Sequence, residues 1–353
     1  MRSVNFFIIL VFVVSIVLLP NEANGKLLRE TQRLIDEANA LGPYIGVVIP
    51  NNFEMNPLLN HPEYKGTQNF IDIGGRRFRF GSVGEKPVIL VMTGLGMLNS
   101  GLATELLLSF FDIEGVVHYG IAGNANPSLN IGDVAIPQYW SHSALWSWQR
   151  YGSGPENKLP LEDAGDYTRE FGYLNIAKYS TKTGSDNLLG NIWYQPEEIF
   201  PVDGVPENRQ HIFWVPVNDG YYTLAKTLES MELEGCLNTT SCLSTQPKVT
   251  TVQRGTSASI YLDNADYRTF IYSKFNISPV EMESAAVALV SHQQRKPFIV
   301  IRALSDLAGG GEHSNEADTF IDLAAKNSVD VAVAFIKLLV NNIASSGHGS
   351  SDV

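Results

Sequence analysis

Continuous runs of apolar residues are the most regular feature of this chain. Four of them stand out, at residues 44–49, 87–92, 115–119 and 298–304. A half-buried strand alternates apolar and polar residues, whereas a strand covered on both faces reads as one unbroken apolar run. The four runs therefore predict four strands buried on both faces.

Helical patterns lie between and around these runs, at residues 27–41, 98–111, 283–294 and 319–343. The second of these helices stands between two apolar runs, in the order strand, glycine-rich turn, helix, strand. This order is a βαβ unit, whose strands run parallel in a sheet with covered faces. The pattern therefore predicts an α/β fold with a largely parallel sheet.

The middle of the chain lacks such patterns. From residue 147 to residue 248, glycine, proline, asparagine and tyrosine are scattered with little periodicity. We interpret this stretch as a long insertion that packs on the core. We therefore expect a single domain over residues 26–345 with an insertion at 147–248. Residues 346–353 are rich in serine and glycine and are predicted to form a disordered tail.

The N-terminus has the parts of a secretory signal peptide. Arg2 precedes an apolar run over residues 4–19, and Ala23 and Gly25 are small residues at the positions that a signal peptidase reads. The run is shorter than the ~20 residues that span a bilayer, which disfavours an uncleaved signal anchor. We expect cleavage after residues 1–25, an extracellular or vacuolar destination, and no membrane association of the mature protein.

Two cysteines agree with an oxidising compartment. Cys236 and Cys242 lie in a segment rich in glycine, asparagine, threonine and serine, and their spacing predicts a local loop disulfide. Acceptor sequons at Asn238 and Asn276 predict N-glycosylation. No metal site is expected, because the seven histidines show no ligand spacing and none lies near the cysteines.

The formal net charge of −12 argues against a nucleic-acid partner, which would need a basic face. Arg76, Arg77 and Arg79 form the basic cluster of the sequence, and two of them alternate with phenylalanine. This alternation predicts the polar face of an edge strand.

Acids and glycines follow the predicted strands, where open α/β sheets bind their ligands. Two further acids, Glu281 and Glu283, stand in the first turn of a predicted helix. Each has an ordinary structural explanation as well: an exposed loop glutamate, a tight turn, or acids in the first turn of a helix. The glycine turn after the second strand superficially suggests a dinucleotide fingerprint, but its third glycine is one residue late. The candidates are Glu54, Gly94, Gly96, Ala122, Gly123, Glu281, Met282, Glu283, Ser305 and Asp306.

In this order along the chain, the candidate segments resemble the nucleoside phosphorylase and nucleosidase superfamily, and in particular its methylthioadenosine/S-adenosylhomocysteine nucleosidases. The similarity runs from about residue 44 to about residue 340, interrupted by the insertion. The stretch 118–140 and the signal peptide look most like the plant bark and vegetative storage proteins of that superfamily. The resemblance implies a three-layer α/β/α fold around a central mixed, largely parallel twisted sheet, a homo-oligomer and no cofactor.

The resemblance also implies that the site releases a purine base from a nucleoside. Asp306 matches the acid that protonates the leaving base, a step worth ~10²–10⁴-fold. Glu54 matches the acid that orients and activates the attacking water. Two acids on opposite faces of the reacting carbon parallel the design of the inverting glycosidases.

Other candidates match the positions that bind the substrate in that family. Glu283 matches the residue that grips the ribose hydroxyls, and Met282 matches the apolar wall beneath the sugar. Gly94 and Gly96 are expected to line the pocket of the nucleophile. The remaining expected contacts are Ala122 and Gly123 beside the base, together with Glu281 and Ser305.

Water is favoured over phosphate as the nucleophile. A phosphate dianion needs several cations, and neither loop 50–54 nor loop 94–101 contains lysine or arginine. Phosphate would also be repelled by Glu54, unless the arginine cluster or a neighbouring subunit enters the site. Residues 254–256 read Arg-Gly-Thr where the nucleosidases carry Ser-Gly-Asp, which leaves the identity of the base open.

Two functions follow from these observations. We favour a secreted nucleosidase for purine nucleosides, which include modified ones such as cytokinin ribosides, because Glu54, Glu283 and Asp306 are all present. A nitrogen-storage glycoprotein with the same fold and little or no catalysis is the alternative, since a fold does not determine a function. A phosphate-dependent nucleoside phosphorylase is the remaining possibility within the family.

Overall fold

The computed structural model of the protein describes residues 29–148, 173–175, 191–310 and 317–346. The expected signal peptide and the tail beyond Ser346 lie outside the described residues. Residues up to Leu41 and residues from Gly42 onward form two separate compact units. The described part of the first unit is helix α2 (Arg29–Asn39), which confirms the helix predicted there.

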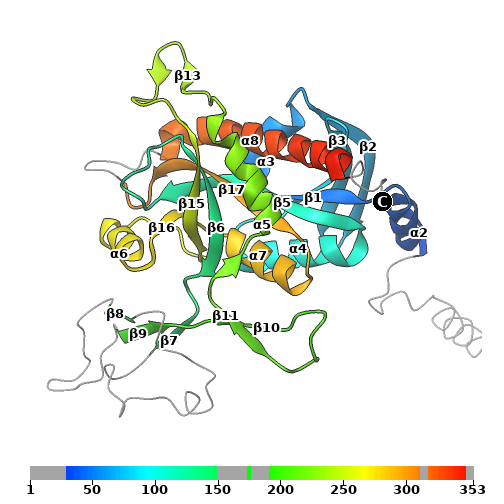
Figure 1. Ribbon diagram of the computed structural model, residues 1–353, viewed down its shortest axis with the longest axis horizontal. Coiled ribbons are helices and arrows are strands. Elements are labelled where there is room, and N and C mark those ends of the chain that lie inside the picture. The colour runs from blue at the N-terminus through cyan, green and yellow to red at the C-terminus, as the bar shows by residue number, and fades with distance from the viewer. Residues whose placement is uncertain (1–28, 149–172, 176–190, 311–316, 347–353) are drawn as a thin grey trace, which may run out of the picture. The chain divides into compact units, whose positions relative to one another are not determined.

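The second unit is built on a ten-stranded mixed sheet (Figure 1). Its strands lie in the order β12-β6-β15-β16-β5-β1-β4-β3-β2, and β17 pairs with both β5 and β6. Their bounds are β1 (Tyr44–Ile49), β2 (Tyr64–Ile73), β3 (Arg76–Val83), β4 (Lys86–Met92), β5 (Ile113–Asn124), β6 (Val134–His142), β12 (Val215–Pro216), β15 (Val249–Ser257), β16 (Ile277–Glu281) and β17 (Phe298–Leu307).

The four apolar runs are confirmed as the neighbouring strands β4, β1, β5 and β17. All three contacts between these neighbours are parallel. Every residue of β1 is buried, as the unbroken apolar run of that strand requires. The carboxyl ends of these parallel strands therefore meet at one edge of the sheet.

Part of the sheet closes on itself. β5 pairs with β17, β17 with β6, β6 with β15 and β15 with β16, and β16 returns to the end of β5. The returning contact is antiparallel and joins Val280 to Gly123. This closure brings the end of β16 next to the carboxyl ends of β5 and β17.

Helices cover both faces of the sheet and form the outer layers (Figure 1). α3 and α8 lie on one face, and α4 and α7 pack against each other on the other. An extensive apolar core lies between α8 and the sheet. The helices are α3 (Asn52–Leu59), α4 (Met97–Phe110), α5 (Asp219–Lys226), the 3-10 helix η3 (Thr227–Ser230), α6 (Ala265–Phe275), α7 (Ser284–Gln293) and α8 (Ala317–Ser346).

The arginine cluster lies on β3, which is not the edge strand that its pattern predicts. β2 pairs with the outer side of β3 and forms the edge itself. Arg77 pairs with Asp72 of β2 at 2.8 Å, and its guanidinium lies 3.9 Å from the centre of the Phe70 ring. The alternation of arginine and phenylalanine marks a strand with one polar face, and such a strand need not be outermost.

The irregular middle of the chain contains two different parts. Short strands outside the main sheet come first: β7 (Trp146–Trp148), β8 (Tyr173–Asn175) and β9 (Asn191–Tyr194) form one sheet, and β10 (Glu197–Ile199) and β11 (Gln210–Ile212) form another. The chain then enters the main body, where β12 pairs with β6 and Ala225 and Leu228 belong to the large apolar core.

A disulfide joins Cys236 and Cys242 across the small hairpin of β13 (Cys236–Asn238) and β14 (Ser241–Cys242). The sequon residue Asn238 is exposed on this hairpin. Asn276 is also exposed and ends α6 in the left-handed conformation, with φ 55°. Both side chains are thus placed where a glycan can be attached.

Candidate active site

A cavity of about 280 Å³ opens where the ends of β1, β5, β16 and β17 meet. It is lined largely by apolar residues, with acids at its walls. The lining consists of Pro50, Asn51, Phe53, Glu54, Leu95, Ile121, Ala122, Gly123, Ile260, Tyr261, Leu262, Val280, Glu281, Met282, Glu283, Ser305, Asp306, Ala308 and Ile321.

Glu54 is held in the first turn of α3, directly after β1. The side chain of Asn51 caps this helix by accepting a hydrogen bond from the Glu54 N–H at 3.2 Å. Glu54 Oε1 accepts a hydrogen bond from the Ile121 N–H at 2.8 Å, whereas Oε2 has no hydrogen-bond partner in the described part of the chain. Burial raises the pKa of Glu54 to about 8, against the opposing effect of Arg302. The buried carboxyl thus keeps one oxygen for a ligand.

Glu283 stands at the junction of β16 and α7. Its Oε1 accepts a hydrogen bond from the Gly96 N–H at 2.8 Å. Burial, and secondly the nearby carboxylate of Glu281, raise the pKa of Glu283 to about 7. Its other oxygen, Oε2, lies 3.8 Å from Arg302 Nη2.

Glu281 lines the same cavity, but protein groups occupy its carboxylate. Oε1 accepts from the Ser257 hydroxyl, and both oxygens accept from the Ser284 N–H at 3.1 and 3.0 Å. Oε2 also accepts from the Glu283 N–H at 3.0 Å and lies 2.5 Å from Arg302 Nη2. Glu281 therefore lines the cavity with both of its carboxylate oxygens already accepting hydrogen bonds from the protein.

Arg302 connects the three glutamates without itself lining the cavity. It lies on β17 and is fully buried. Its Nε donates to the Ser284 hydroxyl at 3.0 Å, and its Nη1 donates to the Ile121 carbonyl at 3.2 Å and lies 3.8 Å from Glu54 Oε1. The positive charge of Arg302 is stabilised by the surrounding acceptors. In turn it offsets the repulsion between the carboxylates of the three glutamates.

Asp306 faces the cavity at the end of β17. The pairing of β17 with β5 shifts between Leu304 and Asp306, so Ser305 is an extra residue in the ladder. Such bulges change the direction in which the following side chain points. The Ser305 hydroxyl donates to Asp306 Oδ1 at 2.7 Å, and both residues are buried.

Eight of the ten predicted site residues lie on this one cavity. The exceptions are Gly94 and Gly96, whose place in the lining is taken by Leu95. Both glycines have positive φ angles, 84° and 92°, which a side chain would disfavour. Their contribution is the shape of the turn, which aims the Gly96 N–H at Glu283.

Two buried residues behind the cavity were missed by the sequence interpretation. Arg302 and His118 are fully buried, and each interrupts an apolar strand, in the runs Val-Ile-Arg-Ala and Val-Val-His-Tyr. A charged or titratable residue inside a buried strand is rare unless it has a partner. Their position inside apolar strands could therefore have identified Arg302 and His118 as candidates from the sequence.

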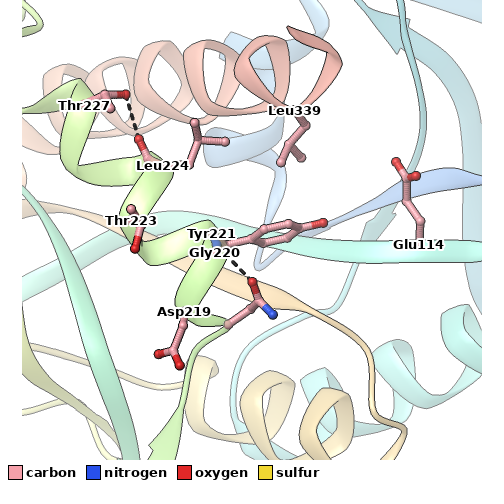
Figure 2. Close-up of a pocket in the computed structure, with 9 residues that line it drawn as sticks. Glu114, Asp219, Gly220, Tyr221, Thr223, Leu224, Thr227 and Leu339 are labelled. Carbon is pink, nitrogen blue, oxygen red and sulfur yellow. Dashed lines mark hydrogen bonds between the residues drawn. The ribbon is translucent and has the colours of Figure 1, made fainter. Parts of the chain in front are cut away.

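A larger cavity, of about 740 Å³, lies elsewhere, between α5, β5 and the end of α8. Figure 2 shows Tyr221 of α5 in this cavity, with Glu114 and Leu339 on its other walls. The Glu114 carboxylate pairs with Lys86, and Asp219 belongs to the first turn of α5. Because no buried acids converge there as they do around Glu54, the smaller cavity is the candidate active site.

Other kinds of site find no support in the described residues. No group of three or more histidine, cysteine, aspartate or glutamate side chains in that part of the chain is arranged to hold a metal ion. Of the helices that the structure describes, none combines the length and the apolar character needed to cross a membrane.

The architecture and the cavity define an α/β protein with acids gathered at the carboxyl ends of its strands. The chain belongs to the phosphorylase superfamily, whose family model matches residues 44–337. Among curated relatives, bark storage protein A of Populus deltoides is 29% identical over 268 residues, covering 75% of this chain and 78% of the relative. The 5'-methylthioadenosine/S-adenosylhomocysteine nucleosidase of Bacillus licheniformis is 27% identical over 266 residues, covering 75% of this chain and 87% of the relative.

Solved structures show the same fold. The 5'-methylthioadenosine/S-adenosylhomocysteine nucleosidase of Helicobacter pylori superposes with a TM-score of 0.56 at 20% identity, covering 85% of this chain and 98% of that one. The futalosine hydrolase of the same organism gives a TM-score of 0.55 at 19% identity, covering 86% and 99%. The three-layer α/β/α fold with a mixed sheet is thereby confirmed.

Proposed function

We propose that this protein is a nucleosidase that hydrolyses the N-glycosidic bond of purine nucleosides. The observation that carries the proposal is the convergence of Glu54, Glu283 and Asp306 on one largely apolar cavity. Relatives whose names describe nucleosidases support it. A related nucleosidase structure, from Colwellia psychrerythraea, holds adenine and has a TM-score of 0.56.

The proposed reaction needs one acid and one base. The bond between the anomeric carbon and the purine nitrogen breaks, its electron pair passes to the purine, and Asp306 supplies a proton to that ring. The oxygen of a water forms the new bond to the anomeric carbon, and Glu54 takes up the proton that the water loses. Free base and ribose are the products, and no cofactor takes part.

The remaining groups hold the substrate in this proposal. Glu283 accepts hydrogen bonds from the ribose hydroxyls, since it lines the cavity and the Gly96 N–H orients its carboxylate through Oε1. Met282 provides the apolar surface beneath the sugar, while Ala122, Gly123 and Ser305 surround the base. Glu281 acts indirectly, because it fixes the backbone at Glu283.

Water is preferred over phosphate on electrostatic grounds. The lining of the cavity, as described above, contains no lysine, arginine or histidine. Arg302 lies behind it, but each of its three nitrogens already has an acceptor within the protein. Arg76 donates to the Asn99 side chain at 2.8 Å. A phosphate dianion would therefore meet carboxylates without the cationic donors that bind it.

We further propose that residues 1–25 are a cleaved signal peptide and that the mature protein is a disulfide-bonded glycoprotein in the extracellular space or the vacuole. The Cys236–Cys242 disulfide and the exposed sequon residues Asn238 and Asn276 agree with this route. Within this proposal, the protein assembles as a homo-oligomer.

Nitrogen storage is the second candidate function. The similarity to bark storage protein A favours it. A storage protein needs the fold and the secretory route but no turnover, so it would tolerate loss of the three acids. Both functions can reside in the same molecule.

The deciding experiment identifies the sugar product. Purified protein is incubated with adenosine, inosine, methylthioadenosine and a cytokinin riboside, with and without phosphate. We expect free ribose or methylthioribose at a rate that phosphate does not change. Ribose-1-phosphate would instead identify a phosphorylase, and the absence of product from every nucleoside would leave storage as the function.

A further inference from the structure

His118 lies directly behind the acids of the cavity and has no role in the reaction described above. It belongs to β5 and is fully buried. Its Nδ1 lies 2.8 Å from the Val48 carbonyl oxygen, and its Nε2 contacts Arg302 Nη2. The imidazole therefore bridges the backbone of β1 and the guanidinium that serves the acids.

The two contacts determine the protonation of the ring. A carbonyl oxygen only accepts, so Nδ1 carries the hydrogen and donates it to Val48. A guanidinium only donates, so Nε2 must be bare and accept from Arg302. Burial, and secondly the charge of Arg302, hold the pKa of His118 well below its ordinary value, which agrees with a neutral ring.

The position of Arg302 affects the charge of both functional carboxyls. Its nitrogens lie 3.8 Å from Glu54 Oε1 and 3.8 Å from Glu283 Oε2. In each case the positive charge lowers a carboxyl pKa that burial raises. A guanidinium that moved away would leave the proton more firmly bound to both carboxyls.

We propose that His118 is a positioning residue, which holds Arg302 at the distance that keeps Glu54 and Glu283 able to ionise. The proposal rests on the nucleosidase activity proposed above. A neutral acceptor is required in this place, because another carboxylate would pull the guanidinium away from the cavity and a cation would repel it. His118 thus acts on catalysis through Arg302 and touches no reacting atom.

A matched pair of variants separates the two contacts of the ring. The amide of Asn occupies the region of Nδ1 and can still donate to Val48, but it is too short to reach Arg302. The amide of Gln extends to the region of Nε2 and can accept from Arg302. His118→Asn therefore loses the proposed function of the residue, and His118→Gln retains it.

The readout is the pH profile of kcat/KM for the nucleoside that wild type hydrolyses best. At low pH, kcat/KM rises with pH as the acids ionise, and we expect this rise to occur about one pH unit higher in His118→Asn than in wild type. Over the pH range of the rise, kcat/KM should therefore be ~10-fold lower than in wild type, and at higher pH it should be near normal. His118→Gln should restore the wild-type rise, and His292→Asn on the distant part of α7 should not change it. A uniform loss at every pH with an unmoved rise, or equal profiles for Asn and Gln, would overturn the proposal.

A second measurement keeps the test independent of turnover. If wild type hydrolyses none of the nucleosides, the proposed activity fails, but the effect on the carboxyls remains measurable through the pH dependence of unfolding. Stability should then fall more steeply between pH 5 and pH 8 in His118→Asn than in His118→Gln, which equally lacks the imidazole and its own titration. Equal slopes in the two variants would show that His118 does not control the charge of these acids.

Discussion

Arg302 and Glu281 form a buried ion pair, with Nη2 2.5 Å from Oε2. Their side chains are 0% and 4% exposed, so water contributes little to the stabilisation of either charge. The pair joins β17 to the end of β16. It therefore connects the strand that carries Asp306 to the segment that carries Glu283.

Removal of the cation should destabilise the fold strongly. In Arg302→Met, the carboxyl of Glu281 loses its buried ion-pair partner and the carboxyls of Glu54 and Glu283 lose a nearby cation, which costs about 3–5 kcal/mol of unfolding free energy. Urea denaturation at neutral pH measures the loss. Arg295→Met breaks the exposed pair with Asp203 and should cost less than about 1 kcal/mol. Equal costs for the two variants would contradict this account.

Loss of the proton donor should abolish most activity and leave the fold intact. Asp306→Asn keeps the size of the side chain but cannot protonate a leaving purine, so kcat/KM should fall by ~10²–10⁴-fold. The rate of base release from the best nucleoside measures the effect, with the unfolding midpoint as a check on structure. The exposed Asp203→Asn serves as the control. Unchanged base release in Asp306→Asn would show that Asp306 is not the acid.

A methyl group at Gly120 should disrupt the site from within β5. A Cβ built there would overlap Arg302 Nη1 and Glu54 Oε1. We expect Gly120→Ala to cost about 1–3 kcal/mol through overpacking and to remove activity, because both side chains must move. In Gly101→Ala, on α4, the new methyl would meet Ala286 Cβ at 3.9 Å, an ordinary contact, so stability should stay equal or rise by roughly 0.5–1 kcal/mol. Full activity in Gly120→Ala would show that the site does not depend on the close packing of Arg302 and Glu54 against Gly120.

Stability should depend on pH through the buried carboxyls. The folded-state pKa of Glu54 is about 8, above its ordinary value of 4.5. Between these values the folded protein holds a proton that the unfolded chain releases, so the contribution to stability is complete below about pH 4.5 and is lost as pH rises through about 8. Glu283 acts in the same direction, and the combined loss should be on the order of a few kcal/mol. Glu54→Gln should flatten the decline, whereas the exposed Glu198→Gln should not. Stability that rises from pH 5 to pH 8 would contradict this prediction.

Some features of the fold can be read locally. The strands around Val47, Val91, Val117 and Ile301 are continuous apolar runs, and a run of that kind is stable only when both faces are covered. The order of strand, glycine turn and helix then requires parallel pairing. The irregular stretch after residue 147 gives no such signal, since β12 and α5 join the core through contacts with residues distant in the chain.

The sequence by itself also determined which segments could form the site. Glu54 and Asp306 each follow a predicted strand, and the ends of neighbouring parallel strands meet at one edge of a sheet. Glu283 begins a predicted helix, and the strand before it, β16, was not predicted. Local pattern therefore sufficed to group Glu54 and Asp306, which are 252 positions apart. Their roles in a reaction came from resemblance and remain proposals.

Only the tertiary structure decided how these acids are supported. Whether a carboxylate is open to a ligand depends on which donors the fold brings to it, and Glu54 and Glu281 look alike until those donors are known. Arg302 and His118 meet because β17 and β5 lie side by side, and Gly96 reaches Glu283 from another loop. The burial of a carboxyl and its hydrogen-bond partners determine its charge and its affinity for a proton. Burial and partners arise only when the sheet is assembled.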